Sequence, residues 1–338
     1  IAAALRPTSM STASVLLAVS TAAPWGSEHC EKDVTRGVRN TAAVAAGELR
    51  ETPATREQAL QIMRDWIQKN PDIRNVRLDD TFLLRFLRHK KFSVPMAQQT
   101  LLKYLNLRKF YKNCMTNLDC EDSNLKEILN DGYIAVSPVR DENGRRVIVY
   151  NMSKFNANKY SCWDMVRAHV IIYETLMEDQ VDQVHGFVHV GDGMGSSKTH
   201  VTAWNPVDFA RLMKWGEQSF PMRHKGLQLF NVPAALKYII DFAASKTSPK
   251  ISERLRLHPT SKTLGREIDL SCLPCEFGGK IPLKEMVEFT HKLLLEKRQV
   301  LLDLDGMEIL STKGIISSRN NSKGTNFIEG SFRKLEID

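Results

Sequence analysis

The feature that most constrains the fold is the alternation of strand-like and helix-like segments between residues 132 and 244. Short apolar runs rich in β-branched residues are typical of buried strands, and segments with apolar residues every three or four positions are typical of helices. Asn143-Gly144, between the first two apolar runs, is a strong hairpin signal. Strands that alternate with helices predict an α/β fold with a mostly parallel sheet. The expected strands are 134–136, 147–150, 186–190 and 227–230, and the expected helices are 163–178, 205–220 and 233–244.

A second region, upstream of the expected sheet, has helical spacing alone. We expect its helices to begin near Thr55, which is a good N-cap residue, near Asp80 and near Ser93. The first residues of the chain are rich in Ala, Ser and Thr and lack periodicity, which suggests disorder. A last helix is expected at 283–297, before a polar linker at 317–324. The sequence therefore divides into a disordered segment at 1–50, a helical module at 51–115, an α/β domain at 125–298 and a C-terminal tail at 299–338.

The charge balance favours an anionic partner. The chain has 338 residues, a net charge of +8 and an isoelectric point near 9.1, which suits nucleic acid, a membrane surface or an acidic protein. No apolar run approaches the roughly 18 residues that cross a bilayer, so we expect no integral membrane protein. Six cysteines are too few for a disulfide scaffold and fit the reduced thiols of a cytosolic protein.

Two short motifs are similar to known cofactor or metal sites, and both have simpler explanations. Gly191-Asp-Gly-Met-Gly195 follows an apolar run, as a dinucleotide-binding loop does, but the residues after it are poor helix formers. We interpret it as a flexible loop at a strand end. Cys272 and Cys275 form a lone CxxC without a second ligand pair, so we interpret them as incidental thiols. We expect neither a catalytic site nor a metal site.

The basic residues gather in clusters beside apolar segments. Arg223 and Lys225 precede an apolar run, Lys250 and Arg254 are spaced to share one helix face, and residues 88–91 read RHKK. These clusters could be solvated faces. Aromatic residues are not interleaved with them, so a surface for stacking nucleic acid bases is not favoured. Phosphate groups at a membrane surface suit them better.

Several motifs, in order, carry a resemblance to a known family. They are TFLLRFLRHKKF at 81–92, SFPMRHKG at 219–226, NVP at 231–233, KISER at 250–254 and LPCEFGG at 273–279. With this order and spacing the chain resembles the CRAL-TRIO lipid-transfer proteins, nearest to the members that carry tocopherol and retinaldehyde. The resemblance covers roughly residues 55–300, and the ending GSFRKLEID is also similar to that of many relatives.

The resemblance implies a helical module followed by a lipid-binding domain. In that domain a mostly parallel sheet floors an apolar cavity, and a mobile amphipathic gate helix, here 233–244, closes it. His169 and Tyr173 match positions that can offer polar contacts to a ligand. The other implied cavity residues are Leu212, Trp215, Phe220, Met222 and Leu227, with Leu236, Ile239 and Phe242 on the gate helix.

The resemblance also implies a function. It predicts a carrier of one hydrophobic small lipid, such as a tocopherol, retinoid or carotenoid, rather than an enzyme, with no cofactor besides the lipid. The carrier would be cytoplasmic and associate transiently with phosphoinositide-containing membranes. The implied phosphoinositide-binding residues are Lys90, Arg223, Lys225, Lys250 and Arg254.

Two alternative functions stay open, and the sequence differs from the family pattern after the gate helix. The chain could instead be a lipid-sensing adaptor that binds a protein partner through residues 300–338, or, resting only on Gly191–Gly195, a nucleotide-dependent enzyme. Relatives often carry Lys-Pro-Phe-Leu after the gate helix, where this chain has Ala244-Ser-Lys-Thr247. The hinge after the gate is therefore less apolar here, which bears on how deeply the gate enters a membrane.

Overall fold

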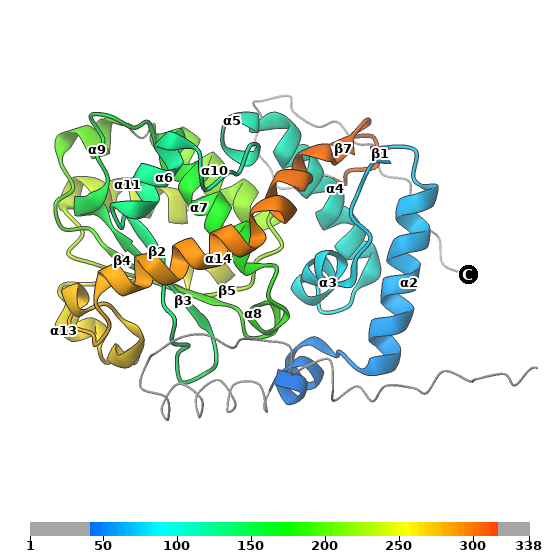
Figure 1. Cartoon of the computed structure of the whole chain (residues 1–338), viewed down its shortest axis with the longest axis horizontal. Coiled ribbons are helices and arrows are strands. Elements are labelled where there is room, and N and C mark those ends of the chain that lie inside the picture. Colours follow the sequence, from blue (N-terminus) through cyan, green and yellow to red (C-terminus); the bar gives the residue numbers. More distant parts are fainter. Residues whose placement is uncertain (1–40, 204, 317–338) are drawn as a thin grey trace, which may run out of the picture.

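A five-stranded sheet forms the centre of the molecule, in a computed structural model that describes residues 41–316 except residue 204 (Figure 1). The strand order is β2-β3-β4-β5-β6; β2 pairs antiparallel with β3 through the expected hairpin, and the remaining pairs are parallel. The prediction of an α/β fold with a mostly parallel sheet is confirmed. The strands are β2 Ile134–Val136, β3 Arg146–Asn151, β4 Phe187–Asp192, β5 His224–Phe230 and β6 Leu255–His258.

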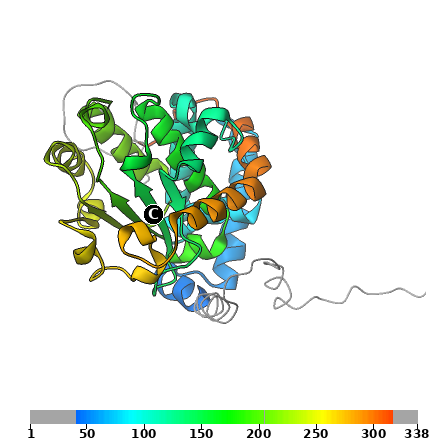
Figure 2. The same ribbon diagram turned by 60° about the vertical axis from the view of Figure 1, so that its left-hand side comes forward.

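The two faces of the sheet are covered by different parts of the chain, because successive side chains of a strand point to opposite faces. Val147 and Val149 pack with a segment around Leu273 and with the start of a long C-terminal helix. This segment lies against the strands in the turned view as well (Figure 2). Ile148 and Tyr150 face the other way, into the core shared with the helical module. We call that second side the inner face.

The helices come from both parts of the chain. The module contributes α2 (Pro53–Lys69), α3 (Asp80–His89) and α4 (Val94–Phe110). The expected cap of α2 is wrong by one turn: Thr52 is the N-cap, and Thr55 is its partner in a capping box. The other helices are α5 Lys112–Met115, α6 Ser123–Asn130, α7 Cys162–Leu176, α8 Gln180–His185, α9 Lys198–Ala203, α10 Pro206–Ser219, α11 Ala234–Ala244, α12 Pro249–Ser252, α13 Ser261–Leu264 and α14 Leu283–Asp303.

Buried charges join the module to the α/β domain. Arg85 of α3 donates to Glu174 of α7 over 2.7 Å, and both side chains are fully buried. Tyr104 of α4 donates its hydroxyl hydrogen to the other oxygen of the same carboxylate, also at 2.7 Å. The two parts therefore pack against each other across a buried polar contact.

The C-terminal helix continues further than the sequence pattern predicted. α14 ends at Asp303 rather than at residue 297, and β7 (Glu308–Ile309) then pairs antiparallel with β1 (Ile73–Arg74) of the module. The first part of the expected tail thus returns along the helical module (Figure 1). The polar linker at 317–324 and the ending GSFRKLEID lie outside the described residues.

The segment expected to be disordered contains a helix. Residues 41–49 are helical, whereas residues 1–40 lie outside the described part of the chain. Ala45 and Leu49 of this helix pack against Val184 of α8 in a small apolar cluster of their own. This N-terminal helix lies below the module and beside α8 in both views (Figures 1 and 2).

Candidate functional site

The five basic residues predicted to bind phosphoinositide come together at one edge of the sheet. Because β5 and β6 are parallel neighbours, the chain enters both strands at the same edge, next to the end of α3. The expectation that two of these residues share a helix face is wrong: α12 ends at Ser252, and Arg254 lies beyond it. Arg254 instead donates to the carbonyl of His224 in the neighbouring strand. We call Lys90, Arg223, Lys225, Lys250 and Arg254 the basic cluster.

The cations of this cluster lie close enough to repel one another. Burial lowers the pKa of Lys250 below its usual range, and the charges of Arg254, Lys91 and Arg223 lower it further. Burial and the nearby charges of Lys103 and Lys250 likewise lower the pKa of Lys90. An anion bound here would relieve that repulsion, because it would stabilise the charged form of each lysine.

A glycine fixes the start of β5 and with it two members of the cluster. Gly186 has φ +83°, a conformation that residues with a Cβ rarely adopt, and a Cβ at this position would lie 2.5 Å from the carbonyl oxygen of Arg223. The Arg223 guanidinium also donates to the carbonyl of Val184 at the end of α8. The side chain of Arg223 is therefore held in place before any ligand arrives.

An acidic side chain from the N-terminal helix lies on the cluster. Glu48 Oε2 accepts hydrogen bonds from Arg223 Nη2 and from Lys225 Nζ, each at 2.6 Å. Partial burial acts to raise the pKa of Glu48, but these two bonds outweigh it and lower the pKa below its usual range. No sequence pattern indicated this contact, since residue 48 belongs to the segment predicted to be disordered.

A chain of hydrogen bonds crosses the inner face of the sheet. Its members, in order, are Tyr133, His169, Tyr173, Tyr150, His189 and His224. The Tyr133 hydroxyl lies 2.7 Å from His169 Nε2, and His169 Nδ1 lies 3.0 Å from the Tyr173 hydroxyl. Each neutral member has one hydrogen to donate, so all the bonds are made when every donor points the same way along the chain. The direction can reverse without breaking a bond.

The second half of this hydrogen-bonded chain connects the inner face to the basic cluster. Tyr150 hydrogen-bonds both Tyr173, at 3.0 Å, and His189. His189 Nε2 lies 2.7 Å from Nδ1 of His224, the residue between the two cluster cations of β5. Burial lowers the pKa of His169 to about 4 and, with Arg254 nearby, that of His224 to about 4, so both rings are neutral at neutral pH. Of these members the sequence pointed to His169 and Tyr173 as ligand contacts and left His224 without a role.

The inner face of the sheet is not closely packed at β5 and β6. Leu227 and Leu229 of β5 and Leu255 and Leu257 of β6 are paired in register and are all half-buried. Such apolar side chains on a covered sheet face are ordinarily buried completely, so the accessible area of these four leucines indicates room beside them on the inner face. Among the predicted cavity residues, Phe220, Met222 and Ile239 are buried, and His169, Tyr173, Leu212, Trp215, Leu227, Leu236 and Phe242 are half-buried.

The two motifs set aside as incidental take structural positions. Gly191 and Asp192 complete β4, and the N–H of Gly193 donates to the Phe230 carbonyl at the end of β5, 2.9 Å away. Cys272 is buried, which raises the pKa of its thiol to about 12. Within the described residues, no group of three or more potential metal ligands occurs.

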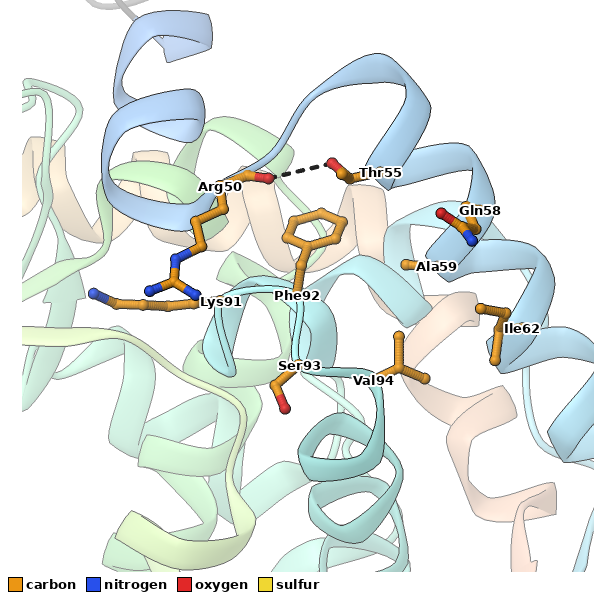
Figure 3. A pocket seen from close by; sticks show the side chains of 9 residues that line it. All are labelled: Arg50, Thr55, Gln58, Ala59, Ile62, Lys91, Phe92, Ser93 and Val94. Atoms are coloured by element: carbon orange, nitrogen blue, oxygen red, sulfur yellow. Dashed lines mark hydrogen bonds between the residues drawn. The ribbon is translucent and has the colours of Figure 1, made fainter. Parts of the chain in front are cut away.

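A groove on the helical module lies apart from the predicted cavity and shares no residue with it. Its volume is about 390 Å³, and its lining includes Arg50, Ile62, Lys91 and Phe92. Figure 3 shows Phe92 pointing from the connection between α3 and α4 toward α2. Arg50, Lys91 and Phe92 all have positive φ angles, an uncommon conformation for residues other than glycine.

Comparisons with known proteins agree with the resemblance seen in the sequence. Residues 130–279 match the CRAL/TRIO domain, and residues 52–125 match the Pinta-like, UBA domain. Clavesin-1 of Xenopus laevis is 32% identical over 73% of this chain and 75% of its own length. Alpha-tocopherol transfer protein-like of Mus musculus is 30% identical over 70% of this chain and 68% of its own.

Two further matches are a curated relative and a solved structure. Clavesin-2 of Homo sapiens is 29% identical over 73% of this chain and 76% of its own length. The solved structure titled "Crystal structure of Sfh5" covers 74% of this chain and 99% of that one, with a TM-score of 0.45 and 11% identity. Across residues 41–203 and 205–316, none of the helices has the length and apolar character that crossing a bilayer requires.

Proposed function

Because the chain belongs to the CRAL/TRIO family of lipid-binding and lipid-transfer proteins, we propose that it carries one hydrophobic small lipid beneath α11 and delivers it to phosphoinositide-containing membranes. The observation that carries the first half of this proposal is the set of half-buried leucines on β5 and β6. A lipid beneath the gate would bury these side chains. Its own apolar surface would gain roughly 25 cal/mol for each Å² removed from water.

The hydrogen-bonded chain supports a lipid with one polar end. His169 and Tyr173 are half-buried members of that chain, on the side of α7 that faces the sheet. Whichever way the hydrogen-bonded chain runs, the oxygen of the Tyr173 hydroxyl keeps a second lone pair, which can accept a hydrogen bond from a lipid hydroxyl. A tocopherol, a retinoid or an oxygenated carotenoid would fit this pattern.

Release of a lipid from such a site needs a second interaction, because the bound state is strongly favoured. A membrane can shift the protein toward an open state only if it binds that state better than the closed one. The basic cluster supplies such an interaction, since phosphoinositide headgroups are anionic and the cluster lies at the start of β5, the strand that carries two of the half-buried leucines. Docking of the cluster on a membrane would bring α11 to the bilayer into which the lipid leaves.

The proposal assigns binding and transfer to the chain and no catalytic step. One relative is named alpha-tocopherol transfer protein-like, which fits a carrier without a cofactor other than its lipid. We place its action in the cytoplasm, at membranes to which it binds reversibly.

Mass spectrometry of organic extracts from the purified full chain tests the carrier proposal most simply. We expect one class of small lipid at close to one molecule per chain, with an apolar body and one oxygen-bearing end. Recovery of ordinary membrane phospholipids alone, in amounts that vary between preparations, would argue against a dedicated carrier.

A second candidate function follows from the match of residues 52–125 to the Pinta-like, UBA domain. The module could bind a protein partner, so that the chain acts as an adaptor that reports its lipid load. A pull-down with the lipid-loaded and lipid-free chain separates the two functions. A load-dependent partner without lipid transfer between vesicles would favour the adaptor.

A further inference from the structure

The contact between Glu48 and the basic cluster has the geometry of an anion in a binding site. A single carboxylate oxygen, Oε2, accepts from Arg223 Nη2 and Lys225 Nζ at 2.6 Å each. Short, charge-assisted bonds of this kind are the ones a phosphate oxygen makes with the same cations. Glu48 is itself half outside the protein, with 47% of its side chain exposed, whereas Arg223 and Lys225 are only 12% and 22% exposed. The cations are fixed, and the carboxylate covers them from outside.

We propose that Glu48 is an internal competitor for the headgroup phosphate, so that the N-terminal helix must leave the basic cluster before Arg223 and Lys225 can bind phosphoinositide. This inference rests on the proposed function, because it concerns the same cluster. It adds a state in which Glu48 covers the membrane-binding site. That state is distinct from the closure of the lipid cavity by the gate helix.

The N-terminal helix is attached in a way that allows it to move. Its buried side chains, Ala45 and Leu49, meet Val184 in a cluster separate from the main core. A hydrogen bond between Thr41 Oγ1 and His185 Nε2, 3.0 Å long, adds to this contact. Among residues 41–203 and 205–316, the buried apolar contacts of this helix are confined to that small cluster, and segments held by small separate clusters open locally at a fraction of the free energy of global unfolding.

The chain directly after this helix supplies a fixed point about which it can swing. Arg50 has φ +65°, a left-handed conformation that ends the helix. Glu51 then forms a buried ion pair with Arg88 of α3, with its Oε1 2.7 Å from Arg88 Nη2. Displacement of residues 41–49 can therefore leave the helical module intact.

A headgroup with several phosphates would outcompete the carboxylate. A phosphomonoester carries roughly −1.5 to −2 charges near pH 7 and has three acceptor oxygens. Glu48 offers one charge. Lys90, Lys250 and Arg254 add positive charge that a larger anion can also reach, because their charges act on one another across the cluster. The exchange of Glu48 for a headgroup is therefore favoured at a membrane surface rich in phosphoinositide.

Removal of the Glu48 charge is the direct test. Glu48→Gln in the full chain keeps the shape of the side chain and leaves Arg223 and Lys225 without their internal anion. We expect it to bind phosphatidylcholine vesicles that contain phosphatidylinositol bisphosphate about 3- to 10-fold more tightly than the parent in co-sedimentation. Glu296→Gln, at an exposed position of α14, changes the net charge equally and should leave the affinity unchanged.

The combined variants separate this inference from the function on which it rests. If the parent binds vesicles with and without phosphatidylinositol bisphosphate equally, the proposed function itself fails at this step. If the parent prefers the phosphoinositide and loses that preference in Arg223→Ala with Lys225→Ala, the cluster is the site. In that case, Glu48→Gln binding no more tightly than the parent would overturn the competitor role, and weaker binding would show that Glu48 orients the cations instead. We further expect Glu48→Gln to have no effect when both cations are already absent.

Discussion

His189 Nε2 and His224 Nδ1 lie 2.7 Å apart, on the parallel neighbours β4 and β5. This contact joins two parts of the molecule with different proposed tasks. On one side, His189 continues through Tyr150 to the half-buried groups of the inner face. On the other, His224 lies between Arg223 and Lys225, and its carbonyl accepts from Arg254. A change in the basic cluster can therefore reach the predicted cavity through β5 itself.

The buried histidines predict that acid weakens the fold. Burial lowers the pKa of His169 to about 4, and burial together with Arg254 lowers that of His224 to about 4, from 6.5. Between pH 6.5 and 4 the two histidines of the unfolded chain become protonated, because their pKa there is 6.5. In the folded protein both rings stay neutral over this range. These groups therefore leave stability unchanged above about pH 7, and the free energy of unfolding falls as the pH drops from 6.5 toward 4. At about pH 5 the loss is about 2 kcal/mol for each histidine.

His224→Gln tests this pH dependence, because glutamine can hydrogen-bond but does not titrate. We expect urea denaturation of the parent at about pH 7 and about pH 5 to differ more than that of the variant. An equal loss of stability in both proteins would mean that His224 does not contribute to it.

Tyr173→Phe should weaken the binding of a lipid alcohol selectively. The change removes the hydroxyl that joins His169, at 3.0 Å, to Tyr150, also at 3.0 Å. Loss of one hydrogen bond of this kind lowers affinity about 3- to 10-fold. We expect that loss for retinol, followed by its fluorescence, and little change for the deoxy analogue that lacks the hydroxyl. Tyr238→Phe, on the outer side of α11 with 68% of the residue exposed, is the matched control. Equal losses for the two ligands would contradict a polar subsite.

Glu174→Ala should lower the free energy of unfolding, because it weakens the contact between the helical module and the α/β domain. The substitution leaves the buried Arg85 with Glu178 as its remaining carboxylate partner and removes the acceptor of the Tyr104 hydroxyl. Leaving buried donors of Arg85 and Tyr104 unsatisfied costs about 1–3 kcal/mol for each group. Urea denaturation measures the loss, and Glu296→Ala on the surface of α14 should stay within about 0.5 kcal/mol of the parent. A loss below about 1 kcal/mol for Glu174→Ala would show that this contact does not hold the two parts together.

Gly186→Ala should disturb the basic cluster through the backbone. A Cβ would lie 2.5 Å from the Arg223 carbonyl oxygen, at a residue with φ +83°. We expect about 1–3 kcal/mol of destabilisation and weaker binding to phosphoinositide vesicles. Gly216→Ala is the control, because its Cβ would meet nothing within 4 Å and alanine suits the α10 helix better than glycine. Unchanged vesicle binding by a folded Gly186→Ala protein would show that this close approach does not position the cations.

Much of the fold could be predicted from local patterns. The apolar run of β2 and the periodic segment of α3 lie where the sequence placed them, because their side chains alternate or repeat along a single element. The N-terminal helix could not be found this way, since only Ala45 and Leu49 of residues 41–49 are buried and they make no continuous apolar stripe. β6 was also missed, because four residues with an exposed arginine among them are too short a pattern.

Residues of the candidate site could be predicted from the sequence only where they lie within a family motif. The five cations of the basic cluster were named from family motifs, and the structure brings them together from separate elements. The Glu48 contact and the hydrogen-bonded chain have no sequence signature, because their partners are far apart in the chain. Glu48 is 175 residues from Arg223, and Tyr133 is 36 residues from His169. Contacts of this range depend on how the elements pack, which no local pattern encodes.

Transfer of the bound lipid between vesicles tests the central claim most directly. The full chain, loaded with its lipid, is mixed with acceptor vesicles with and without phosphatidylinositol bisphosphate, and the rate of lipid arrival is measured for the parent and for Arg223→Ala with Lys225→Ala. We predict that the phosphoinositide accelerates transfer by the parent, and that the double variant loses this acceleration while its affinity for the lipid stays nearly the same. Equal transfer rates for the two proteins at phosphoinositide-containing vesicles would contradict the account.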